Sequence, residues 1–364
     1  MKRIINIIFC SIFCVAIGLP ILFFHNQDEK CVALENRTLS EMPALDQSIL
    51  PITSDTTQSI ESFISDHIGF RADFVNLANT VKVKVAGISS SDSVIIGKDG
   101  WLFYNPVGDD GDPLGEFTGT NDFSVEEEQE MLRFLESVQD MCDSNGAQFY
   151  LIICPDKYSI YGADYLPDCY ASQAGETRTD RLVDYIRQNS DICCIYPKAE
   201  MLEMRDYAKL FYKTDTHWSG LGAYIAYREW YYEYTGEWLP ALEDAKTVLQ
   251  SRAGTDLLNM LAIRQKTDDY YRVDLGRGIT YTNEHIDDSR MDLNAGSTNM
   301  NGLKALVFRD SFSNAILMYM LQDFQEATLL FRRVNLSDAE LIQEQQPDVV
   351  IFEIVERYCD LIGS

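Results

Sequence analysis

Histidine is scarce in this sequence, and its cysteines lack the spacing of the common metal and redox motifs. Among 364 residues there are four histidines, and no two are close enough for H-E-x-x-H or a similar metal-binding arrangement. Nine cysteines are present, but no two form a C-x-x-C pair, which argues against a zinc ribbon or a thioredoxin motif. We therefore expect no metal and no other cofactor, although ligands scattered along the chain would leave no such signature.

Basic residues are also few. The chain has 30 Lys and Arg against 57 Asp and Glu, so its net charge is -27. A surface of this kind repels polyanions, and we expect no nucleic-acid partner. It does not exclude a glycan partner. The composition is 46% hydrophobic, enough for one large or two medium domains with a real core.

Charge is absent from one long run near the N-terminus. The basic start Met1-Lys2-Arg3 is followed by an apolar stretch from Ile4 to Phe24. About 20 apolar residues suffice to cross a bilayer as a helix. Because the basic residues come first, we expect the rest of the chain to lie outside the cytoplasm. A cleaved signal peptide is the alternative, but residues 25–30 lack small residues at the cleavage spacing, so we favour an uncleaved anchor.

The pattern of the chain divides it into three regions. Residues 1–27 form the anchor or signal peptide, and residues 28–92 read as an extended and then helical lead-in, with an interruption at 66–71. Residues 93–364 are expected to form the main domain. Within it the pattern weakens at about 239–300, which we interpret as an insertion at the rim of the sheet, where substrate loops usually lie.

Apolar runs and helical periods alternate through the main domain. This alternation predicts an α/β fold, with a parallel sheet flanked by helices on both faces. The expected elements are a hairpin at 94–104, strands at 149–153, 192–196, 305–308, 327–331 and 349–352, and helices at 124–142, 179–188, 198–208, 222–234, 314–321 and 338–345.

Three residues suggest nucleophilic catalysis. Asp215 and His217 stand two positions apart, a spacing that in a tight loop lets the carboxylate hold the imidazole in one tautomer. Ser311 follows the apolar run 305–308 and precedes a helical pattern, a context that raises a serine to the edge of a sheet. The set supplies a nucleophile, a general base and its orienting acid. The alternative is structural, with a loop hydrogen bond at His217 and a helix cap at Ser311.

Several longer motifs occur in one order along the chain, and together they are more specific than any one of them. They are Glu35-Asn36-Arg37 with Pro43, Gly69-Phe70-Arg71, Ile96-Gly97-Lys98-Asp99-Gly100-Trp101-Leu102-Phe103, Pro155-Asp156-Lys157 with Tyr161 and Leu166-Pro167, Thr214-Asp215-Thr216-His217-Trp218 with Gly222-Ala223, Arg309-Asp310-Ser311-Phe312, and Glu353-Ile354-Val355-Glu356-Arg357. This series resembles the DHHW proteins and the alginate O-acetyltransferases of the AlgX and AlgJ type, whose catalytic domain is SGNH-hydrolase-like.

The resemblance implies an SGNH-like, flavodoxin-like fold whose motif order is circularly permuted relative to ordinary SGNH esterases. It implies Asp215, His217 and Ser311 as the triad. Thr216 departs from the pattern, because the family name expects a histidine there. The Gly and Asn blocks that complete the oxyanion hole of ordinary SGNH enzymes have no match. The backbone N–H of Ser311 is one candidate donor.

The function implied by the resemblance is extracytoplasmic O-acetylation of an exopolysaccharide or a cell-wall glycan through an acyl-serine. A membrane O-acyltransferase would deliver the acetyl group. A glycan acetyl esterase with the same triad is one alternative, and a non-catalytic glycan-binding or assembly protein is another. We expect Trp101, Trp218 and Arg309 to bind substrate. Trp230 is a further tryptophan whose ring could stack on a sugar.

Overall fold

The computed structural model describes residues 2–24, 38–42, 54–106, 111–250, 255–264, 268–287 and 291–364. These residues fall into two compact units. The first is Met1–Val94 with Thr255–Lys266, and the second is Ile95–Gly254 with Thr267–Ser364. The division near residue 94 lies where the pattern changes, but a short part of the expected insertion belongs to the first unit. The motif Glu35-Asn36-Arg37 with Pro43 lies outside the described residues.

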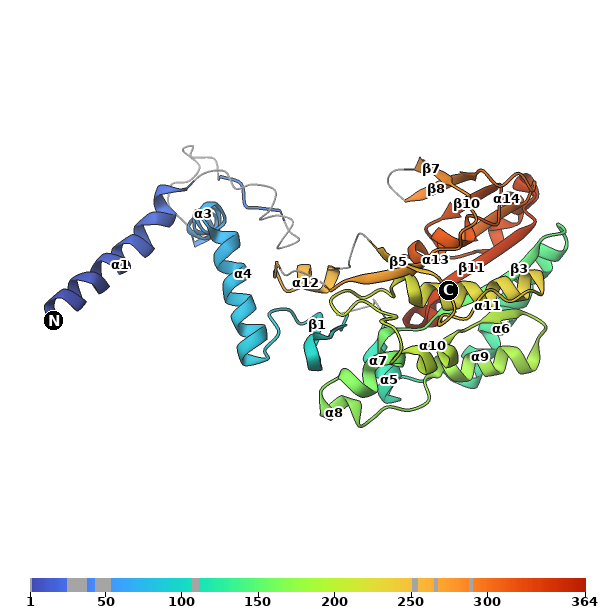
Figure 1. Cartoon of the computed structure of the whole chain (residues 1–364), viewed down its shortest axis with the longest axis horizontal. Coiled ribbons are helices and arrows are strands. Elements are labelled where there is room, and N and C mark those ends of the chain that lie inside the picture. Colours follow the sequence, from blue (N-terminus) through green and yellow to red (C-terminus); the bar gives the residue numbers. More distant parts are fainter. Residues whose placement is uncertain are drawn as a thin grey trace. The chain divides into compact units, whose positions relative to one another are not determined.

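The first unit is helical. Its helices are α1 (Lys2–Leu22), α3 (Ser54–His67), α4 (Arg71–Val81), which continues into a π-helical turn at Lys82–Ala86, and α12 (Asp256–Met260) (Figure 1). Among the described residues, one helix, Arg3–Leu22, is long and apolar enough to cross a membrane, a property that a signal sequence shares. The predicted interruption is confirmed, because Phe70 takes a left-handed backbone with φ 62° between α3 and α4.

The second unit is built on a seven-stranded sheet with the order β4-β3-β11-β9-β10-β8-β7. The first five strands in this order are parallel, and β8 and β7 are antiparallel additions at one side. The strands are β3 (Gln148–Cys154), β4 (Cys193–Ile195), β7 (Tyr281–Asp287), β8 (Asp292–Ser297), β9 (Lys304–Phe308), β10 (Glu326–Leu330) and β11 (Val349–Val355).

Helices cover both faces of this sheet, as Figure 1 shows. The main ones are α6 (Val125–Asp143), α7 (Lys157–Tyr165), α9 (Arg178–Asn189), α10 (Lys198–Met204), α11 (Gly220–Thr235), α13 (Ser313–Met320) and α14 (Ala339–Gln345). Short helices lie at Pro113–Thr118 (α5), Asp168–Ala171 (α8), Lys98–Gly100, Leu336–Asp338 and Glu356–Leu361. The predicted start of α6 is confirmed, with a reciprocal capping box between Ser124 and Glu127.

Two hydrophobic cores lie on the two faces of the sheet. In β3, Leu151 and Ile153 face the core that contains α6 and α9, whereas Tyr150 and Ile152 face the core that contains α11 and α13. Strand β11 alternates in the same way. Because successive side chains of a strand point to opposite faces, a strand that is apolar at every position must be covered on both. The apolar runs therefore predicted the inner strands of the sheet correctly.

The region 239–300 differs from the expected rim insertion. Strands β7 and β8 extend the main sheet, and β5 (Thr247–Gln250) pairs with β6 (Tyr270–Val273) in a separate two-stranded sheet. The β7–β8 hairpin gave a weak signal because little of it is buried. Ala295 of β8 packs against the core, while Thr282 and Glu284 of β7 are exposed, and so is Asn283, which pairs with Ala295. The predicted hairpin at 94–104 is confirmed as β1 (Val94–Ile96) and β2 (Leu102–Tyr104).

Candidate active site

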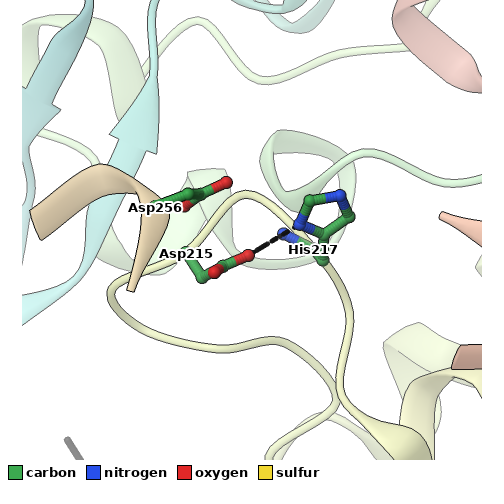
Figure 2. A group of neighbouring side chains, drawn as sticks. All are labelled: Asp215, His217 and Asp256. Atoms are coloured by element: carbon green, nitrogen blue, oxygen red, sulfur yellow. Dashed lines mark hydrogen bonds and ion pairs between the residues drawn. The ribbon is translucent and has the colours of Figure 1, made fainter. Parts of the chain in front are cut away.

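Asp215, His217 and Ser311 meet in the second unit. The His217 Nδ1 atom lies 2.7 Å from the Asp215 Oδ1 atom, and the His217 Nε2 atom lies 2.8 Å from the Ser311 Oγ atom. Figure 2 shows the Asp215 carboxylate directed at the imidazole; Asp256, drawn in the same view, belongs to the first unit. The backbone N–H of His217 also donates to Asp215 Oδ1 at 3.0 Å. The structure therefore brings together the three residues predicted as a triad, in the order acid, base and nucleophile.

Ser311 is placed by the end of β9. The strand stops at Phe308, and Ser311 lies in the turn before α13. In the parallel sheet, β9 lies between β11 and β10, so this turn opens at the carboxyl edge of the inner strands. Ligand and catalytic sites of open α/β sheets form at that edge. The strand, turn and helix expected around Ser311 are all present.

The loop that carries Asp215 and His217 is a short hairpin closed by backbone hydrogen bonds between its two ends. Phe211 and Trp218 form an isolated antiparallel bridge, and the Tyr212 N–H donates to the His217 carbonyl at 3.2 Å. Ser219 then caps α11, because its hydroxyl accepts from the N–H of the second and third helical residues. The short hairpin explains how two residues at i and i+2 face each other. It also holds the imidazole at the start of a buried helix.

A buried lysine also holds the loop that carries Asp215 and His217 in place. Lys157, at the start of α7, is 2% exposed, and its ammonium group donates to the Leu102 carbonyl at 2.9 Å and to the Asp215 carbonyl. A buried ammonium group must satisfy its donors within the protein. Lys157 therefore ties the triad loop to the β1–β2 hairpin. The sequence marked it as part of a family motif but did not show this contact.

Asp310 shapes the turn around the nucleophile. One of its carboxylate oxygens accepts from the Phe312 N–H at 2.8 Å, and the other accepts from the Val355 N–H at 2.8 Å. Its own N–H donates to the Glu353 carboxyl at 2.9 Å. The residue before Ser311 is thus joined to the residue after it and to the end of β11. Asp310 belongs to one of the family motifs in the sequence, but its position there indicated no role.

Glu353 lies fully buried beneath this turn. Its second carboxyl oxygen lies 3.0 Å from the thiol of Cys154, on the neighbouring strand β3. Burial, and then the charge of Asp310, raise the pKa of Glu353 well above the usual carboxyl range. The Glu353 carboxyl group therefore resists ionisation while one of its oxygens holds the Asp310 N–H.

The candidate substrate-binding residues are not on a substrate surface. Trp218 is fully buried, and its indole N–H donates to the Phe312 carbonyl at 2.8 Å. Trp101 is 3% exposed and stacks on Tyr161 with ring centroids 4.3 Å apart. Because both indoles are buried, we correct the expectation: Trp101 packs in the core, and Trp218 holds the turn that follows the nucleophile. Trp230, likewise, is fully buried.

Arg309 is also buried, at 4% exposed. Its guanidinium group donates to the Asn314 side chain and to the Met291 carbonyl, each at 3.0 Å. These bonds join the nucleophile turn to the start of α13 and to the residue before β8. The side chain therefore holds the turn in place, which corrects its expected contact with substrate.

The backbone around Ser311 limits where an oxyanion can bind. The Phe312 N–H is taken by the Asp310 carboxylate, so it is not directed at a substrate. The Ser311 N–H is therefore the candidate hydrogen-bond donor to the oxyanion. It lies just before α13, and the positive end of a helix stabilises negative charge that develops there.

A family model described as "SGNH hydrolase-like domain, acetyltransferase AlgX" matches residues 94–291, more than half of the chain. The matched range includes Asp215 and His217, and Ser311 lies beyond it. The assignment of Ser311 therefore depends on the geometry above.

Solved structures similar to this chain include a DHHW family protein from Eubacterium siraeum DSM 15702 and PatB1 of Bacillus cereus with a sulfonyl adduct. The first is 14% identical, covers 76% of this chain and 94% of that chain, and has a TM-score of 0.52. The second is 17% identical, covers 74% and 99%, and also has a TM-score of 0.52. At such identities the likeness concerns the fold, and it confirms the predicted α/β fold with a central sheet flanked by helices. The sheet is mostly parallel, whereas a parallel sheet was predicted. The comparison with curated proteins found no match to this sequence.

Proposed function

Because the chain belongs to the family of SGNH hydrolase-like domains of the acetyltransferase AlgX type, as its motifs predicted, we propose that it is a serine-dependent O-acetyltransferase acting on a glycan outside the cytoplasm. The observation that carries this proposal is the 2.8 Å separation between His217 Nε2 and Ser311 Oγ. At this distance the imidazole can take the hydroxyl proton as the oxygen attacks.

The first half-reaction forms an acyl-enzyme. The Ser311 oxygen attacks the carbonyl carbon of the acetyl donor while its proton passes to His217 Nε2. Asp215 accepts a hydrogen bond from Nδ1–H at 2.7 Å, which keeps Nε2 free to act as base and stabilises the imidazolium. When the tetrahedral intermediate collapses, the donor's oxygen leaves with the proton from His217. The acetyl group is then an ester of Ser311.

The second half-reaction reverses these roles. A sugar hydroxyl gives its proton to His217 and attacks the acetyl-serine carbonyl. The bond to Ser311 breaks, and the serine oxygen recovers the proton from the imidazolium. The products are the O-acetylated sugar and the free enzyme. With water as the second nucleophile the same residues would release acetate, so an esterase differs only in the acceptor.

The N-terminal helix bears on where this chemistry takes place. Helix α1 has the length and apolar composition of a membrane span or a signal sequence. The basic residues before it favour an active domain outside the cytoplasm. An acetyl donor there has to be supplied across the membrane. A membrane O-acyltransferase is the partner class that fits this need.

The test is acetyl transfer from a small acetyl ester to an oligosaccharide, with Ser311→Ala compared with the parent. We expect a loss of about 10⁴-fold or more, since the nucleophile is removed. The matched control is Ser337→Ala, an exposed serine outside the site. Near-normal transfer by Ser311→Ala would reject the proposal, and acetate release that ignores added oligosaccharide would favour the esterase.

Labelling gives a second measurement that needs no acceptor. A fluorophosphonate should modify Ser311 in the parent and fail to do so in His217→Ala, because the base that activates the hydroxyl is gone. Peptide mapping identifies the modified residue. Equal labelling of both proteins would show that His217 is not the base that activates Ser311.

A further inference from the structure

We propose that a cavity between α9, β4 and the second half of α11 is a subsite for a pyranose unit that carries no carboxylate. The cavity has a volume of about 390 Å³ and includes Trp238, Tyr232, Glu229, Glu233 and Arg187 in its lining. This inference deepens the proposed function, since the sugar unit would belong to the acceptor polymer. The whole cavity lies in the second unit.

An exposed aromatic pair forms one wall of the cavity. The other three tryptophans are at most 3% exposed, whereas Trp238 is 53% exposed. Its ring lies against Tyr232 with centroids 4.1 Å apart and an angle of 8° between the planes, and the Arg228 guanidinium lies 4.4 Å from the indole centroid. The indole is therefore held in place before any ligand arrives, which lowers the entropic cost of binding. A large, rigid aromatic surface beside a polar cavity suits the C–H face of a sugar ring.

The polar lining is acidic. Glu229 and Glu233 line the cavity, while Arg187 donates to the Cys194 carbonyl at 3.0 Å. Nearby, Arg228 is paired with both oxygens of Glu200 at 3.0 Å. Glutamate side chains exchange hydrogen bonds with hydroxyl and amino groups in either protonation state, and an ionised one repels other carboxylates. With a net charge of -27 on the whole chain, this lining favours a neutral or amino-bearing sugar over a polyuronate.

The distance between the triad and the cavity sets the minimum length of an acceptor that reaches both. Helix α11 begins at Gly220, three residues after His217, and extends to Thr235. At 1.5 Å per residue, the cavity-lining end near Glu233 is about 20 Å along the helix from its start. A polymer bound at both places must span at least that distance. A disaccharide at the triad therefore gains nothing from Trp238.

The experiment measures binding by calorimetry in the full chain with Ser311→Ala, so that no acetyl transfer occurs. The probes are short and long linear oligomers of glucose, of partly deacetylated N-acetylglucosamine and of a uronic acid. Adding Trp238→Ala should weaken binding of the long neutral or amino oligomers by about tenfold or more, the effect of losing roughly 1.4 kcal/mol. Trp238→Phe, which keeps an aromatic ring, should restore most of it. Binding of disaccharides should not change.

Tyr207→Ala is the matched control, since this tyrosine is 61% exposed and does not line the cavity. Melting temperatures show whether each variant is folded. Unchanged binding of long oligomers in Trp238→Ala, tightest binding of the uronic acid series, or no binding of any series would each overturn the subsite. Failure of the proposed function is seen separately, as absence of Ser311-dependent acetyl transfer in a protein whose Trp238-dependent binding is intact.

Discussion

The indole N–H of Trp218 donates a hydrogen bond to the carbonyl of Phe312 at 2.8 Å. These residues directly follow the base and the nucleophile, and they are 94 positions apart in the chain. Both are fully buried, and their rings pack with centroids 5.7 Å apart. The contact joins the two loops whose approach sets the distance between His217 and Ser311. Trp218 therefore serves as a positioning residue for the candidate triad.

Replacing Trp218 by Phe keeps an aromatic ring and removes this hydrogen bond. We expect fluorophosphonate labelling of Ser311 to slow by roughly 10- to 100-fold, because small misplacements of reacting groups are costly. Stability should fall by about 1–2 kcal/mol in urea unfolding. The control is Trp230→Phe, since the buried Trp230 indole nitrogen has no hydrogen-bond partner among the described residues. Equal slowing in both variants would show that bulk, and not the bond to Phe312, matters.

Replacing Asp215 by Asn should lower kcat by about 10⁴-fold with little change in KM. The amide would donate to Nδ1 and leave Nε2 protonated, so that the imidazole cannot take the serine proton. Steady-state rates with a small acetyl ester measure both constants. Thr216→Val is the comparison, because the Thr216 hydroxyl lies 3.2 Å from the same ring nitrogen. A loss in Thr216→Val as large as in Asp215→Asn would contradict the assignment of Asp215 as the orienting acid.

Replacing Asp310 by Asn exchanges one carboxylate oxygen for an NH₂ group. That group cannot accept a hydrogen bond, so the backbone N–H of either Phe312 or Val355 loses its acceptor. We expect a fall in kcat of roughly 10- to 100-fold with a smaller change in KM, and a loss of about 1–3 kcal/mol of stability. Glu353→Gln is the control, because its amide oxygen can still accept from the Asp310 N–H. If kcat is normal in Asp310→Asn while stability falls, the residue supports the fold and does not position the nucleophile.

Glu229 should make stability depend on pH. Burial, and then Glu200, raise the pKa of Glu229 from its ordinary 4.5 to about 7. Glu233 adds a smaller repulsion in the same direction, while the charges of Arg187 and Arg228 oppose the shift. Between these two values the unfolded chain releases the proton while the folded chain keeps it, so stability falls as pH rises. Glu229→Gln removes this loss. Its advantage over the parent should grow to roughly 1–3 kcal/mol from about pH 4 to about pH 8.

The measurement is urea unfolding of both proteins across this range. Glu237→Gln, an exposed glutamate just beyond the end of α11, serves as the control for a change of surface charge. A difference between Glu229→Gln and the parent that is constant with pH, or that shrinks as pH rises, would contradict the inferred protonation of Glu229.

Much of this protein was predictable from local sequence. The apolar runs in β3 and β11, the capping box at Ser124 and the break before Arg71 each depend on residues within a few positions of one another. Periodicity and capping act over such short distances, which is why the inner strands and most helices were placed correctly. The motif order predicted the family and the fold, and the spacing of Asp215 and His217 predicted a tight loop.

Other features depend on which segments the sheet brings together. The strand order β11-β9-β10 helps to place the turn at Ser311 next to the loop that carries His217. No short-range sequence pattern predicts that these two segments are neighbours. Burial of Trp101, Trp218 and Arg309 likewise follows from packing, because an indole or guanidinium group has the same sequence signature inside a core as on a binding surface. The sequence by itself determined which chemical groups are present and which strands are buried. The tertiary structure decided which of those groups touch, since contact between residues 94 positions apart is set by strand order and helix packing rather than by local propensity.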